Sequence, residues 1–204
     1  PFCMRIKLYG WNYDKSLSPP LSEATMVKSI INLICENKRE EEVARFKSRT
    51  YFLDSKITDI RLPFRKYYGK NEDFKISKIL MSYYSAVRET FKNADGDYLW
   101  DFKESQKTMS NVLQTTVGFQ SFLLLLVEIC SKTKKEEELL DKEYYFNLLK
   151  SAIGLKFYDL NRYPLTSKSK NILYFELSLS IYPSNNPTDP RRIKLNELLK
   201  ELNA

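Results

Sequence analysis

The stretch NVLQTTVGFQSFLLLLVEIC, residues 111–130, is the most apolar part of the chain. It is too long for a typical strand and too short to cross a bilayer as a helix. Its apolar residues would cover most of a helix surface, which is typical of a helix buried on nearly all sides. We therefore predict a mainly α fold, with a helical domain around a buried central helix at about 111–130.

Four further segments carry helix signals. Between residues 73 and 92, apolar residues recur at every third or fourth position, as they do along an amphipathic helix. Ser22 and the pair Asp189-Pro190 are of the residue types that open helices. We expect helices near 23–36, 73–92, 139–153 and 190–203.

Two segments predict a minor β or extended component. At 172–182, apolar and more polar residues alternate; the apolar ones are Leu173, Phe175, Leu177, Leu179 and Ile181. This period of two predicts a strand, with a buried helix as the alternative. We interpret residues 2–13, which mix apolar and basic positions, as an edge strand or an extended arm.

The length and composition fit one domain. Of the 204 residues, 43% are apolar and 29% are charged, which is an ordinary globular composition. The sequence opens at Pro1 without an initiator methionine, so either its start was processed or it is a fragment of a larger protein. We expect residues 1–204 to form a single helical domain.

The residue types exclude several kinds of active site. The chain has no histidine, so it cannot itself supply His-based catalysis or His-ligated metals. It also lacks a glycine-rich phosphate loop. Its cysteines, Cys3, Cys35 and Cys130, lie far apart in sequence, which favours reduced thiols in a cytoplasmic protein over a zinc site. We predict no catalytic residue, metal, cofactor or membrane partner, and we lean toward no enzymatic activity.

An acidic loop offers one alternative, a calcium site. Calcium needs several oxygen ligands that converge from one loop. Gly96 comes too early for an EF-hand, and no third alternating acid follows, so we prefer a solvated turn. The candidate ligands are Asn93, Asp95, Asp97, Asp101 and Glu104.

Basic and aromatic residues gather in two groups along the chain. The net charge of +7 permits an anionic partner. Cations beside aromatic rings suit phosphate contact and base stacking, although rings that anchor a core, with lysines covering them, are the commoner case. The nucleic-acid-binding residues that we predict are Arg61, Arg65, Lys66, Tyr67 and Lys70 in the first group and Arg162, Lys168 and Lys170 in the second.

Several blocks of sequence together resemble the C-terminal half of DGQHR-domain proteins, a group that includes relatives of the DNA-phosphorothioation-associated protein DndB. The blocks are PFCMRIKLYG, LSEATMVKSIINLI, LPFRKYYG, KILMSYYSAVRETF and NVLQTTVGFQSFLLLLVEI, in this order over most of residues 1–130. The DGQHR motif itself is absent, so no functional residue of the family carries over to this chain. The most specific matches are Tyr83, Tyr84, Ala86 and Val87, followed by Thr116, Gly118, Phe119 and Phe122.

The resemblance implies association with DNA-modification, restriction or defence systems. Together with the basic groups, it leads us to expect a non-enzymatic DNA-associated module that contacts phosphates. One alternative is that the chain supports a nucleotide-dependent or nuclease enzyme whose active site lies in an absent N-terminal half. A pocket lined by residues 2–13 and the helix at 73–92 would favour that view. Another alternative is a structural protein-interaction domain with an exposed apolar patch.

Overall fold

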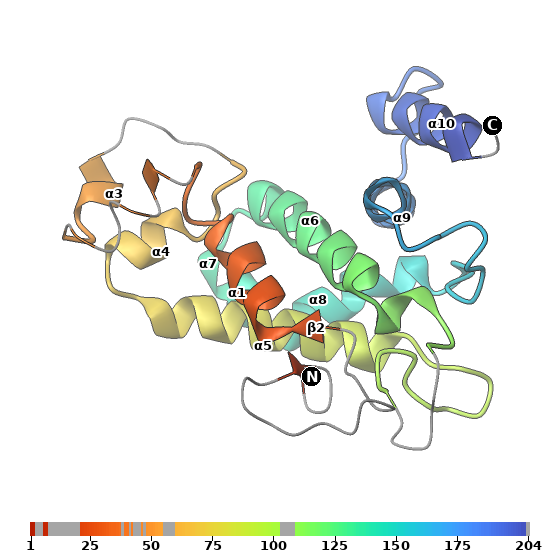
Figure 1. Ribbon diagram of the computed structural model, residues 1–204, viewed down its shortest axis with the longest axis horizontal. Coiled ribbons are helices and arrows are strands. Elements are labelled where there is room, and N and C mark those ends of the chain that lie inside the picture. Colours follow the sequence, from red (N-terminus) through yellow and green to blue (C-terminus); the bar gives the residue numbers. More distant parts are fainter. Residues whose placement is uncertain are drawn as a thin grey trace.

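Helices make up most of the computed structural model (Figure 1). It describes residues 1–2, 6–7, 21–37, 39–40, 42, 46, 48–54, 60–102 and 109–202. The prediction of a mainly α fold is confirmed. In chain order the elements are β1 (Ile6–Lys7), β2 (Leu21–Ser22), α1 (Glu23–Ile31), α3 (Tyr51–Asp54), α4 (Arg65–Gly69), α5 (Asp73–Thr90), η2 (Val112–Gln114), α6 (Thr116–Lys132), α7 (Glu136–Leu140), α8 (Lys142–Leu149), η3 (Lys150–Ala152), α9 (Ser167–Ile181) and α10 (Pro190–Leu202).

The predicted central helix is α6, and it begins later than the apolar run does. The segment opens with the single 3-10 turn η2, and the chain then turns at Thr115. The Thr115 hydroxyl accepts a hydrogen bond from the Gly118 backbone N–H at 3.1 Å, which caps α6. Most of α6 is buried, including Phe119, Phe122 and Leu126, none of which has exposed surface. Each such side chain contributes about 1.5–3 kcal/mol of burial free energy.

Helix α5 covers one side of α6, and its tyrosines bond to the backbone of α6. The Tyr83 hydroxyl donates to the Phe122 carbonyl at 2.7 Å, and the Tyr84 hydroxyl donates to the Phe119 carbonyl at 3.0 Å. The rings of Tyr84 and Phe119 are stacked, with centroids 5.3 Å apart. Buried hydroxyl groups need such partners, so these bonds fix how the two helices sit against each other.

The predicted strand at 172–182 is wrong, because this segment belongs to helix α9. The residues that α9 buries follow helical spacing, but three of them, Ser169, Glu176 and Ser178, are polar. Glu176 is buried because it accepts hydrogen bonds from Arg162 and Tyr163. The sequence pattern hid this stripe, since polar residues occupy core positions there. The buried residues are Ser169, Ile172, Leu173, Glu176, Leu177, Ser178 and Ile181.

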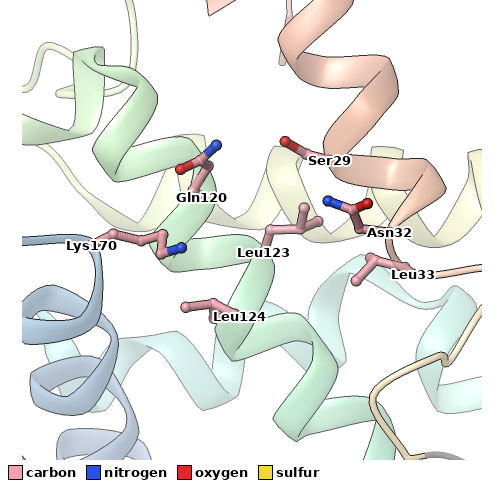
Figure 2. A pocket seen from close by; sticks show the side chains of 7 residues that line it. All are labelled: Ser29, Asn32, Leu33, Gln120, Leu123, Leu124 and Lys170. Atoms are coloured by element: carbon pink, nitrogen blue, oxygen red, sulfur yellow. The ribbon is translucent and has the colours of Figure 1, made fainter. Parts of the chain in front are cut away.

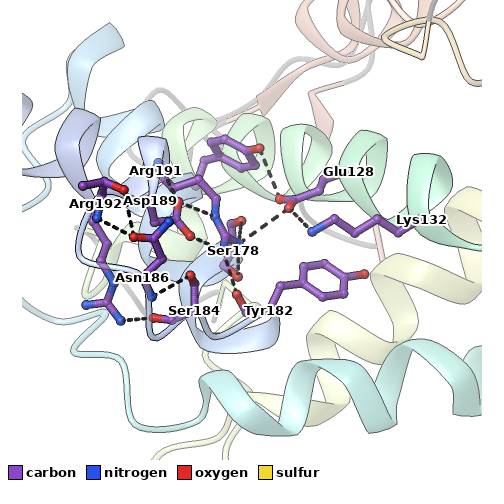
Figure 3. A network of polar contacts seen from close by, with 11 residues as sticks. Glu128, Lys132, Ser178, Tyr182, Ser184, Asn186, Asp189, Arg191 and Arg192 are labelled. Atoms are coloured by element: carbon purple, nitrogen blue, oxygen red, sulfur yellow. Dashed lines mark hydrogen bonds and ion pairs between the residues drawn. The ribbon is translucent and has the colours of Figure 1, made fainter.

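A polar network fastens α10 to α9 and α6 (Figure 3). Asp189 opens α10 as predicted, and its carboxylate accepts from the Arg191 backbone N–H at 2.8 Å. The Arg191 guanidinium donates to Asp189 at 2.7 Å and to the Tyr182 carbonyl at 2.9 Å. It also lies 3.8 Å from the Glu128 carboxylate on α6. This arginine therefore connects three helices.

The minor β component consists of one short parallel pair in the described part of the chain. Ile6 pairs with Leu21, and Lys7 pairs with Ser22. Before this pair in the sequence, Phe2 packs against Tyr84, with the centroids of the two rings 5.1 Å apart. The prediction of a strand or arm at 2–13 otherwise lies outside the described residues. So does most of the pocket that an enzyme-supporting role would need.

Gly118 permits the closest approach in the core. A Cβ atom at this position would lie 2.4 Å from the Val112 carbonyl oxygen and 2.8 Å from the Leu113 Cα. Both atoms belong to backbone, which cannot turn aside as a flexible side chain can. The glycine thus lets η2 fold back against the first turn of α6.

We expect Gly118→Ala to lower the free energy of unfolding by roughly 1–3 kcal/mol, the usual cost of overpacking. Gly154→Ala is the matched control, because a Cβ there would meet no atom within 4 Å. Urea unfolding of both variants measures the difference. Equal stabilities of the two variants would contradict the close contact.

Candidate nucleic-acid interface

The two predicted groups of basic residues lie at opposite ends of the molecule. The first group surrounds α4 at one end of the long axis, and the second precedes and enters α9 at the other end (Figure 1). The structure therefore does not bring all eight predicted residues onto one surface. Each group has to be judged by its own burial and pairing.

Arg65 is part of the core. It is only 5% exposed, and its guanidinium donates to both oxygens of Glu40, at 2.7 and 2.9 Å. It also donates to the Ile34 carbonyl at 3.2 Å and lies over the ring of Phe52. A cation enclosed and paired in this way cannot also contact a phosphate. We therefore remove Arg65 from the predicted interface.

Tyr67 is likewise buried, and its ring forms part of the wall of a cavity of about 370 Å³. Burial raises the pKa of its hydroxyl to about 12. A ring that is 6% exposed offers no free face to a base, so Tyr67 is an anchor and is also removed. The cavity is lined by Ile60, Pro63, Tyr67, Cys130, Ser131, Thr133, Lys134, Glu136 and Leu139.

Exposed cations lie around this cavity, and we call Arg61, Lys66, Lys70 and Lys134 the basic rim. All four are exposed. Lys66 and Lys70 form no ion pair in the described part of the chain, yet both lie near enough to Glu136 to help lower its pKa. The main cause of that lowered pKa is the hydrogen bond from Lys75. Glu136, the one carboxylate among the described lining residues, is thus already neutralised by another lysine.

The second group is more fully paired. The Arg162 side chain donates to Glu176, and Lys168 lies 2.8 Å from the Glu201 carboxylate. Lys170, in contrast, forms no ion pair among the described residues, and it lines a different, smaller cavity. Two of the three predicted cations in this group therefore carry a carboxylate partner of their own.

Lys134 joins the basic rim from the corner between α6 and α7, a contribution that the sequence analysis missed. The run SKTKKEEE at 131–138 is charged, and its cations and acids cannot be separated by inspection. In the fold, Glu136 turns toward Lys75. Lys134 instead lies at the cavity wall. Only the three-dimensional arrangement assigns the two charges to different neighbours.

Cys130 lines the same cavity from the last turns of α6. Burial raises the pKa of its thiol to about 12, so the thiol stays protonated and poorly nucleophilic at neutral pH. The chain has no histidine, and no second cysteine occurs among the described residues that line the cavity. This arrangement gives no support to a nucleophilic site there.

The described residues form neither a metal-binding cluster nor a helix that could cross a membrane. In the described ranges, histidine, cysteine and acidic residues form no group of three or more that could hold a metal ion. Glu104 of the acidic loop lies outside those ranges. None of the described helices has both the length and the apolarity that crossing a bilayer requires. Comparisons with protein-family models, curated proteins and solved structures found no match.

We expect loss of charge at two neighbouring residues of α4 to change the free energy of unfolding by very different amounts. Arg65→Met leaves Glu40 buried and unpaired, so the free energy of unfolding should fall by about 3–5 kcal/mol. Lys66→Met removes an exposed charge and should change it by no more than about 0.5 kcal/mol. Urea denaturation measures both, and equal effects would contradict the burial of Arg65.

The same pair predicts a pH dependence. The hydrogen bond from Arg65 holds the pKa of Glu40 below its ordinary value. The pair's contribution is therefore fully present above about pH 4.3, the usual glutamate pKa, and is lost as the pH falls through the lower folded-state pKa. Glu40→Gln should flatten the stability profile in that acidic window. Glu137→Gln, an exposed control on α7, should retain the original slope.

Proposed function

We propose that this chain is a non-enzymatic module that contacts DNA through the basic rim. The observation that carries the proposal is that the exposed Lys66 and Lys70 lie near Glu136, which lines the same cavity as the exposed Lys134, and that none of these lysines forms an ion pair among the described residues. Duplex DNA is densely charged, and exposed cations that displace its counterions bind it without reading sequence. The rim is thus suited to phosphate contact.

The arrangement favours positioning on the backbone over recognition of bases. The cations of the basic rim come from α4, the residues on either side of it and the α6–α7 corner, none of which presents a long helix to a groove. The nearest ring, Tyr67, is buried. Phosphate contacts fix the orientation of a protein on DNA but carry no sequence information. Base recognition would then fall to another part of the assembly.

The resemblance to DGQHR-domain proteins places this proposal in a biological setting. It suggests a bacterial DNA-modification or defence protein acting in the cytoplasm, where thiols such as those of Cys35 and Cys130 stay reduced. In that setting the present chain holds DNA and does no catalysis itself.

Exposed apolar side chains favour a second candidate, a protein-interaction domain. Ile60 is 71% exposed and Phe74 is 68% exposed, and Ile60 also lines the cavity inside the basic rim. Exposed apolar side chains can mark a protein-binding surface where they are contiguous. A protein partner on this surface would compete with DNA, so the two candidates are distinguishable by experiment.

We expect this chain to bind labelled duplex DNA with an affinity that falls steeply as salt is added. Lys66→Glu/Lys70→Glu should weaken binding by roughly tenfold or more and reduce the slope of log K against log salt by about two. Fluorescence anisotropy across a salt titration measures both quantities.

A matched control is Lys194→Glu/Lys200→Glu, which makes the same change in net charge on α10. This control should bind DNA nearly as well as the unchanged chain. Equal losses in the two variants would show that net charge alone drives binding. No binding by the unchanged chain at low salt would sink the proposal and favour the protein-interaction domain.

A further inference from the structure

A small cleft lies between α1 and α6, closed at one end by the start of α9 (Figure 2). Its volume is about 200 Å³. Helix α1 contributes one wall, α6 contributes the opposite wall and floor, and Lys170 reaches in from α9 (Figure 2). The lining residues are Ser29, Asn32, Leu33, Gln120, Leu123, Leu124 and Lys170.

The cleft combines an apolar floor with polar walls. Leu33 and Leu123 are buried, at 7% and 5% exposure, and Leu124 is half-buried beside them. Asn32 and Gln120 face the cleft from opposite walls (Figure 2). Each side-chain amide offers two N–H donors and a carbonyl acceptor. Neither amide has a hydrogen-bond partner among the described residues, so both remain available to a bound molecule.

Among the described residues that line the cleft, Lys170 is the only charged one. Its backbone is held in place, because the Ser121 hydroxyl lies 2.9 Å from its carbonyl oxygen and donates to it. Its ammonium group, by contrast, has no ion-pair partner in the described part of the chain. The neighbouring Lys168 differs, since it is paired with Glu201. The described lining residues include no carboxylate, so this part of the cleft is complementary to a negative group.

We propose that this cleft binds a small organic anion. A carboxylate or phosphate on the ligand would pair with the Lys170 ammonium, and an amide-like or heterocyclic edge would bond to Asn32 and Gln120. The apolar body of the ligand would lie on the leucine floor. Small-molecule sites usually have this composition, in which a few polar groups fix the orientation of a ligand that lies on an apolar surface.

The size of the cleft limits the ligand. A volume of about 200 Å³ corresponds to roughly seven water molecules at about 30 Å³ each. That is below the range of about 300–1,000 Å³ usual for drug-sized ligands. The part of the ligand inside the cleft should therefore be no larger than a single N-acylated amino acid or the base of a nucleotide whose phosphate lies at the mouth of the cleft.

This inference does not rest on DNA binding by the basic rim. Lys170 enters α9 at one end of the molecule, whereas α4 lies at the other end (Figure 1). The cleft is also too small to admit a duplex. Loss of one activity by substitution should therefore leave the other unchanged, and the two proposals can fail separately.

The test is a titration of the ¹⁵N-labelled chain, followed by amide chemical shifts. The probes are N-acetyl-leucine for the carboxylate arm, the nucleoside monophosphates for the phosphate arm, and acetate and inorganic phosphate as bare anions. We expect either N-acetyl-leucine or a nucleoside monophosphate to change the amide chemical shifts of Asn32, Gln120 and Lys170, with a change that saturates as the probe is added. The bare anions should bind more weakly, because they do not use the leucine floor.

Lys170→Met should raise the Kd of the bound probe about tenfold or more, the usual effect of losing a charged hydrogen-bond partner. Lys168→Met, two residues away, should leave the Kd unchanged. Asn32→Ala is a second variant on the other wall, where weaker binding is also expected. Thermal unfolding confirms that each variant is folded.

Three results would overturn the proposal. The first is that no organic probe shifts the lining amides at millimolar concentration. The second is that inorganic phosphate or acetate binds as tightly as the organic probes, which would indicate simple charge attraction. The third is that Lys168→Met weakens binding as much as Lys170→Met does.

Discussion

The burial of α6 on nearly all sides is the constraint on which the rest of the structure depends. A helix so enclosed needs apolar neighbours around it and partners for the polar groups along it. Tyr83 and Tyr84 meet this need from α5 by donating to its backbone carbonyls. Ser121, a polar residue of α6 itself, has its partner in α9, where its hydroxyl donates to the Lys170 carbonyl. Helix α6 also lines the two cavities beside which our proposed sites lie, through Cys130 in one and through Gln120, Leu123 and Leu124 in the other.

The helical fold could be predicted because its signals are local. Apolar periodicity and helix caps depend on residues a few positions apart, so the start of α1 at Ser22 and of α10 at Asp189 could be predicted from sequence. Helix α9 could not, because Glu176 occupies a core position that only its distant partners make tolerable. Arg162 and Tyr163 stabilise that carboxylate, and no local pattern reveals the pairing.

The candidate site was harder to predict, for the same reason. Arg65 and Lys66 are adjacent and equally cationic in the sequence, yet one is buried against Glu40 and the other is exposed. The partner of Arg65 lies 25 residues away, among the several charged residues that surround Glu40 in the sequence. The reverse holds for Lys134, whose place beside α4 follows from the packing of α6 and α7. Charge alone therefore does not identify an interface, and burial and pairing decide which cations remain available.

Hydrogen exchange in the presence of duplex DNA measures directly whether the basic rim contacts DNA. We expect slower exchange of backbone amides in residues 60–70 and 131–139, with no change at 162–170. Slower exchange confined to 162–170, or spread evenly over the surface, would contradict it.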